Sequence, residues 1–128
     1  MFKLVAGSVK IEHYAKKAEE AIAVGDLMQA DGAGGLEVCD DSSNAPVGVS
    51  LAEVEATDAT TAKIPVVIPT SETIFEVPVG EGTLTLAMVG NSYDLADGGS
   101  IDVTSQDEGI VTVVGVKSAS VALVKINS

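Results

Sequence analysis

The side chains best suited to catalysis near neutral pH are a single histidine, His13, and a single cysteine, Cys39. A thiolate nucleophile needs a base beside it and a third group that orients that base. His13 stands in a basic segment, and we expect it to be exposed on the surface. Cys39 follows an apolar stretch and is predicted to pack as a small hydrophobic residue. The sequence therefore predicts no Cys–His nucleophile, no disulfide within the chain and no enzymatic activity.

Carboxylates offer a second kind of chemistry. They gather in two groups, one of Asp31, Asp40 and Asp41 and one of Asp94, Asp97 and Asp102. Calcium takes several oxygen ligands, but the first group lacks the ligand spacing of an EF-hand loop. Paired carboxylates can also hydrolyse glycosides, yet four aromatic residues in all are few for a sugar-binding cleft. We expect solvated, turn-forming aspartates, and neither a metal nor a cofactor, because phosphate-binding, dinucleotide-binding and zinc motifs are missing from the sequence.

The charge balance excludes several classes of partner. The net charge of −12 repels phosphate backbones, so we expect no binding to nucleic acid and none to anionic membranes. No apolar run approaches the length of a membrane span, and the apolar start of the chain is too short for a signal peptide. These features predict a soluble protein that is made in a cytoplasm.

Basic residues concentrate at the start of the chain. Residues 1–17 hold four of the seven lysines against one glutamate, which gives this segment +3 and leaves −15 for the rest. Residues 1–14 also carry alternating apolar positions, which predicts an extended arm or an edge strand. Such a segment could be held on its own acidic body by charge attraction, or it could dock on an acidic partner. The candidate partner-binding residues are Phe2, Lys3, Leu4, Val9, Lys10, Ile11, Lys16 and Lys17.

The elements that must position these residues are predicted to be β-strands. The chain is 46% hydrophobic but only 3% aromatic, so its core must consist of Val, Ile, Leu and Ala, which suits a thin sandwich or a small barrel. We predict an all-β fold, a small β-sandwich or open β-barrel of about nine or ten short strands. One short helix is expected over residues 14–23, where alanines share one helical face. Residues 15–128 are expected to form a single domain that folds without the arm.

Individual strands follow from turns and alternation. Residues 26–30 and 36–39 are predicted to form a hairpin around a glycine-rich turn. Residues 47–55 are predicted to form one long strand, and residues 56–61 a turn. The three prolines within residues 62–79 predict strands that lie at sheet edges or run between sheets. Residues 83–88 alternate cleanly and predict a strand that points Leu84 and Leu86 inward.

Two stretches of the chain resemble each other. Residues 24–49 contain Val-Gly, a glycine-rich turn, Leu-Glu-Val and Val-Gly-Val in order, and residues 89–116 contain Val-Gly, a similar turn, Ile-Asp-Val and Val-Gly-Val. The spacing from the first Val to the triplet is the same in both, and the second stretch is slightly longer before Val-Gly-Val. This pattern indicates an internal repeat of β units.

The same motifs resemble a known family. The run from Ala21 through Val24-Gly25-Asp26-Leu27-Met28, a glycine turn and Pro46-Val47-Gly48-Val49 is similar to the capsid decoration (cement) proteins of tailed bacteriophages. Residues 90–95 with Val114-Gly115-Val116 repeat that pattern, so the resemblance covers roughly residues 21–126. Met28 departs from the family pattern, in which a valine is more usual.

The resemblance implies a function and partners. It implies a virion structural protein that binds the outer surface of a phage capsid, bridges capsomers and stabilises the shell. The implied partners are the major capsid protein and two further copies in a homotrimer. The implied location is the capsid exterior, after synthesis in the cytoplasm of the host bacterium. The alternative from another class is a tail, fibre or adhesin-type module that recognises a glycan or protein on the host surface.

Overall fold

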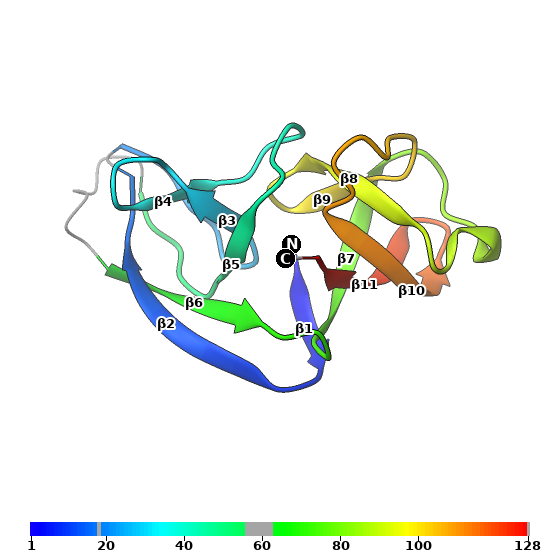
Figure 1. The fold of residues 1–128 in the computed structure, drawn as a ribbon, viewed down its shortest axis with the longest axis horizontal. Helices are drawn as coiled ribbons and strands as arrows, with labels where there is room; N and C mark the ends of the chain where they lie inside the picture. Colours follow the sequence, from blue (N-terminus) through cyan, green and yellow to red (C-terminus); the bar gives the residue numbers. More distant parts are fainter. Residues whose placement is uncertain (18, 56–62, 128) are drawn as a thin grey trace.

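The fold is built almost entirely of β-strands. The computed structural model describes residues 1–17, 19–55 and 63–127, and these residues form eleven strands and one turn of 3₁₀ helix, η1 (Figure 1). The all-β expectation is confirmed. The strands are β1 (Lys3–Ala6), β2 (Val9–Ala15), β3 (Leu27–Ala30), β4 (Leu36–Val38), β5 (Pro46–Ser50), β6 (Lys63–Pro69), β7 (Ile74–Glu81), β8 (Ser92–Asp97), β9 (Ser100–Asp102), β10 (Val111–Ser118) and β11 (Val121–Ile126), and η1 covers Leu86–Met88.

These strands form two sheets with the same connectivity. The first sheet has the order β2-β6-β5-β3-β4, and the second has β7-β11-β10-β8-β9 with β1 added outside β7. In both, the first strand of the unit lies beside the fifth, then come the fourth, the second and the third. We call β2–β6 the first unit and β7–β11 the second unit; Figure 1 shows them side by side. The first two strands of the second unit begin at the same distance along the chain from the first two strands of the first unit. Val9 therefore corresponds to Ile74, and Leu27 corresponds to Ser92.

Each sheet also closes on itself through a parallel pair between its first and third strands. In the second unit β7 pairs with β9, with Glu81 opposite Asp102. In the first unit Lys16, directly after β2, makes the equivalent parallel bridge to Leu36 at the start of β4. The offset that relates Val9 to Ile74 also relates Lys16 to Glu81, so the two units share their closure as well as their strand order.

The glycine-rich turns fold as the sequence predicted. The hairpin of β3 and β4 is confirmed, and its turn is held by Asp31, whose Oδ1 accepts hydrogen bonds from the N–H groups of Ala33 and Gly35. Gly34 adopts φ +91°, which glycine accepts without steric cost. The counterpart in the second unit is the hairpin of β8 and β9, where the Asp97 carboxylate accepts from the Gly99 N–H.

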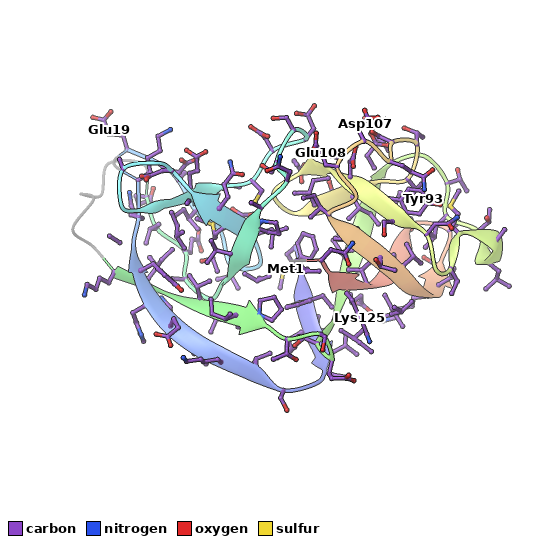
Figure 2. All side chains as sticks on the ribbon, viewed as in Figure 1. Met1, Glu19, Tyr93, Asp107, Glu108 and Lys125 are labelled. Carbon is purple, nitrogen blue, oxygen red and sulfur yellow. The ribbon has the colours of Figure 1, made fainter. Side chains whose placement is uncertain are left out.

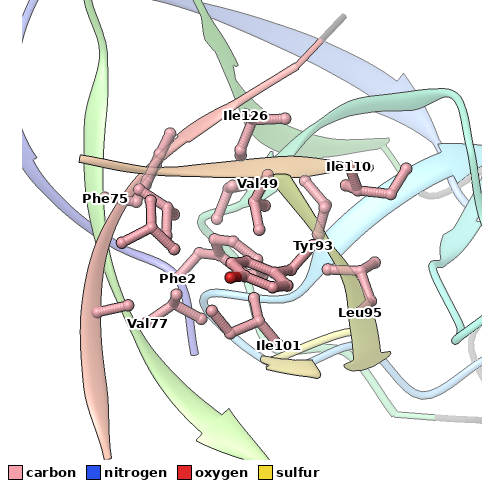
Figure 3. Packing of buried hydrophobic residues seen from close by; sticks show 14 of the residues in the cluster. Phe2, Val49, Phe75, Val77, Tyr93, Leu95, Ile101, Ile110 and Ile126 are labelled. Carbon is pink, nitrogen blue, oxygen red and sulfur yellow. The ribbon is translucent and has the colours of Figure 1, made fainter. Parts of the chain in front are cut away.

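Two hydrophobic clusters hold the units together. The smaller lies in the first unit and contains Ile22, Met28, Leu36, Ile64 and Val66. The larger fills the second unit and also takes in residues of the first, including Leu27, Val49 and Val67. Figure 3 shows Val49 and Phe2 among the side chains of the second unit in this larger cluster. Because one core spans both units, the chain packs as one body.

Several local expectations are wrong. Residues 14–23 contain no helix in their described part: β2 runs to Ala15, and both Lys16 and Ile22 make β-bridges. The predicted strand over residues 83–88 is instead a loop and η1, which leave Leu84 buried but Leu86 78% exposed. The strand predicted over residues 47–55 ends at Ser50, and the turn predicted at residues 56–61 lies outside the described residues.

The proline-bearing strands are also placed differently from the expectation, because β6 and β7 each have a neighbour on both sides. The carbonyl of Pro65 accepts a hydrogen bond from Leu51, so the missing N–H of Pro65 faces the side of β5. β5 pairs with β6 only at Val66 and Val67. Proline is tolerated here because the ladder on that side is short.

Candidate interaction surface

Residues 1–15 contain two strands that join both units. β1 pairs with β7 of the second unit, and after a turn at Gly7 and Ser8, β2 pairs over its whole length with β6 of the first. Thr73 Oγ1 donates to the carbonyl of Ser8 over 2.8 Å and fixes this turn. The segment is therefore held on its own body by ladders of backbone hydrogen bonds.

Two of the eight candidate partner-binding residues are buried. Phe2 is 2% exposed and meets Phe75 edge to face, with ring centroids 6.1 Å apart. Its N–H donates to the carbonyl of Gly25 over 2.8 Å. Lys16 is fully buried, and its Nζ donates to the carbonyl of Lys17 over 2.9 Å. The prediction that these two side chains are available to a partner is wrong, because both belong to the interior of this chain.

The other candidates lie at or near the surface. Val9 is half-buried and packs against the larger core cluster. The exposed candidates are Lys3, Leu4, Lys10, Ile11 and Lys17. Lys17 contacts Glu37 across 3.4 Å, and Lys10 contacts Glu12 of its own strand across 2.9 Å. The hydrogen bond and charge of Lys10 lower the pKa of Glu12, and Glu12 in turn raises the pKa of Lys10.

β1 exposes apolar as well as basic side chains. All four of its residues are exposed, including Leu4 at 41% and Val5 at 52%. Lys3 is paired in register with Glu76, whose pKa is lowered by a hydrogen bond from Lys117 and further by the charge of Lys3. Val5 belongs to this surface as well, although it is not among the eight candidates predicted from the sequence. The sequence predicted an extended arm or an edge strand here, and β1 is an edge strand, but the alternation could not show that all four of its side chains are exposed.

The acidic residues gather at a different rim. A cavity of about 260 Å³ lies between a loop of each unit and is lined by Asp41, Ser42, Asp94, Leu95, Asp102, Ser105, Asp107 and Glu108. Figure 2 shows Asp107 and Glu108 at the upper rim of the molecule, whereas β2 runs along the lower rim. Within the described residues, no group of three or more His, Cys, Asp or Glu side chains is arranged to hold a metal ion.

Asp94, which lines this cavity, is occupied by its own loop. Its carboxylate accepts four hydrogen bonds, from Ser105 Oγ and from the N–H groups of Asp107, Glu108 and Gly109, at 2.5–3.0 Å. Removal from water alone raises the pKa of this carboxyl group, but the hydrogen bonds outweigh that effect and lower the pKa. The carboxylate thus acts as the anchor of the loop.

The two candidate catalytic side chains lie in different environments. Cys39 is 3% exposed in the larger core cluster, which confirms its expected role as a small hydrophobic residue, and burial raises its pKa to about 12. His13 is exposed on β2, also as expected. A thiol this weakly acidic supplies almost no thiolate at neutral pH.

Comparison with models of known protein families gives no match, and no curated protein matches the sequence. Among the described residues, no helix is long and apolar enough to cross a membrane.

Proposed function

We propose that this protein is a structural component of a tailed-phage virion that binds the outer surface of the capsid and stabilises the shell by bridging capsomers. The proposal rests on the sequence resemblance together with one structural observation. That observation is the exposed surface of β1, where Lys3, Leu4 and Val5 stand on a body of strongly negative charge.

The chemistry of this surface suits an acidic, partly apolar partner. Exposed ion pairs contribute only about 0–1 kcal/mol each, so lysine mainly steers the encounter and sets its salt dependence. The apolar side chains of Leu4 and Val5 supply area that can be removed from water on binding, at about 25 cal/mol per Å². The rigid ladder between β1 and β7 holds both kinds of side chain in place before binding, which lowers the entropy cost of association.

The alternative, a module that recognises a host glycan, has less support. Such a module uses exposed aromatic rings as a platform for sugars. Here Phe2, Phe75 and Tyr93 are buried, and Tyr14 is half-buried. A protein-recognising tail or fibre module is compatible with the same β1 surface, and the head-binding experiment separates it from a cement protein.

Co-sedimentation with expanded phage heads tests the proposal. We expect wild-type protein to bind heads saturably and to raise their resistance to heat. The double variant Leu4→Ser with Val5→Ser should dissociate faster, and Lys3→Gln should mainly slow association. Leu86→Ser is the matched control, because Leu86 is the most exposed large apolar residue of the described chain and lies far along the sequence on η1. Failure of the wild-type protein to bind heads overturns the proposal. If the β1 variants occupy the heads as fully as wild type, the contact with the capsid lies on another surface of the molecule.

A further inference from the structure

The shared connectivity of the two units exposes a difference between their edges. In the second unit, β1 occupies the outer edge of β7 at Ile74–Glu76. The equivalent place in the first unit is Val9–Ile11 on β2, because Val9 corresponds to Ile74. Within residues 1–17, 19–55 and 63–127, no strand pairs with β2 on this side until the bridge at Lys16. The first unit therefore has a vacant edge where the second unit has a strand.

The backbone groups at this edge point outward. The carbonyl of Pro65 faces β5, so alternate residues of β6, Ile64, Val66 and Ile68, face β2. They lie opposite Tyr14, Glu12 and Lys10. The N–H and C=O groups of Val9, Ile11 and His13 consequently face away from β6. The same alternation places the N–H of Lys17 on the outward side. This N–H donates to the carbonyl of Leu36, next to the bridge at Lys16 that closes the edge.

We propose that two copies of this chain pair through this edge, with their β2 strands antiparallel about a two-fold axis at Ile11. In this register Ile11 faces Ile11 of the second copy, and Val9 faces His13. All three positions present outward backbone groups, so they form about six hydrogen bonds across the seam. The 52% exposed Ile11 side chain is then covered by its own counterpart. The inference does not depend on the proposed capsid role.

The charges on β2 favour pairing with the β2 strand of a second copy. The register that centres on Ile11 places Lys10 opposite Glu12 of the second copy, and Glu12 opposite Lys10 of the second copy. Lysine on an edge strand ordinarily discourages pairing with other strands. Here the two residues lie 2.9 Å apart within one strand, so two copies create a square of alternating charges. Opposite charges directly across an antiparallel pair stabilise it, and like charges destabilise it.

The location of the edge also reduces repulsion between copies. The net charge of −12 opposes association of two bodies. The seam, however, lies in the segment that carries +3, and the acidic cavity lies at the opposite rim. The resulting assembly is a dimer, in place of the homotrimer that the sequence resemblance implies.

Sedimentation velocity on charge variants tests the register. Lys10→Glu places carboxylates at all four positions of the square, and Glu12→Lys places ammonium groups there. Each variant alone should associate about tenfold to a hundredfold more weakly than wild type. An equimolar mixture of the two should form a heterodimer, because one chain supplies only negative and the other only positive groups. The double variant Lys10→Glu with Glu12→Lys should dimerise like wild type.

A backbone variant tests the edge itself. His13 corresponds to Pro78 of β7, so His13→Pro should fold while removing an outward N–H from the seam. We expect it to be monomeric, with the melting temperature that the wild-type protein has at concentrations too low for dimerisation. Glu12→Pro is the contrasting variant, because it removes a hydrogen bond to β6 and should lower the melting temperature. A wild-type protein that is monomeric at all concentrations, or trimeric, overturns the proposal. Single charge variants that associate as strongly as wild type also overturn it. The proposal is likewise overturned if the β2 edge binds phage heads but not a second copy of the chain.

Discussion

At the scale of single residues, Asp94 shows how one carboxylate can organise a loop. The loop between β9 and β10 is one residue longer than its counterpart between β4 and β5, and four of its residues, Ser105, Asp107, Glu108 and Gly109, donate to Asp94. The counterpart of Asp94 in the first unit is Gln29, whose side chain instead donates to Glu37. The carboxylate that anchors this loop is therefore a feature of the second unit, where the loop is longer.

The substitution Asp94→Asn should cost roughly 2–4 kcal/mol of unfolding free energy, because an amide group replaces an acceptor that faces N–H donors. The pKa of Asp94 is lower in the folded protein than its ordinary 3.8, so its contribution is complete above about pH 4 and is lost as pH falls through the folded pKa. Urea unfolding at a series of pH values should show that the difference in unfolding free energy between wild type and variant becomes smaller in acid. Asp107→Asn, with an exposed side chain in the same loop, is the control and should unfold like wild type. A difference in unfolding free energy that stays constant in acid would show that the charge of the Asp94 carboxylate does not cause the stabilisation.

At the scale of elements, the N-terminal strands are structural parts of both sheets. β1 and β2 add one edge strand to each sheet, and Phe2 contributes a large side chain to the shared core. Removing them uncovers β7, β6 and the larger core cluster at once. We therefore expect deletion of residues 2–14 to abolish cooperative unfolding, contrary to what the sequence alone predicts.

A point substitution isolates the contribution of the core from that of the ladder. Phe2→Ala should cost roughly 3–5 kcal/mol, because it removes a fully buried ring and its contact with Phe75. Leu4→Ala in the adjoining strand should change stability by only about 0.5 kcal/mol, because Leu4 is exposed. Guanidinium unfolding of both variants provides the measurement. Equal effects at the two positions would indicate that the segment is not seated in the core.

At the scale of the whole molecule, the units are coupled where the β8–β9 hairpin meets the first unit. The N–H of Leu27 donates to the Gly98 carbonyl over 2.7 Å, and a Cβ at Gly98 would lie 2.2 Å from a methyl carbon of Val38. Scanning calorimetry should therefore show one transition with equal calorimetric and van't Hoff enthalpies. Gly98→Ala should destabilise the protein by about 1–3 kcal/mol through overpacking, whereas Gly99→Ala meets ordinary contact distances and serves as the control. Two separate transitions in the wild-type protein would contradict this coupling.

The sequence was informative where structure is local and uninformative where it depends on distant partners. The β3–β4 hairpin was predictable because its turn carries its own glycines and its own aspartate acceptor. Residues 14–23 favour a helix by composition, but pairing of Tyr14 with Ile64 and of Ile22 with Val54 overrides that propensity. The sequence predicted an arm or an edge strand over residues 1–14, but it could not predict that β1 and β2 join different sheets and that Phe2 is buried in the core, because this depends on which strands become neighbours.

The placement of β1 has a consequence for biosynthesis. β1 leaves the ribosome before β7, the strand with which it pairs, and the Met1 amine donates to the carbonyl of Gly99. These contacts join residues far apart in the sequence, and such non-local pairing makes folding slow. Until β7 is translated, Phe2 lacks the ring of Phe75 against which it packs. β1 is thus translated well before β7, and it can take its native place in the sheet only after β7 has been translated.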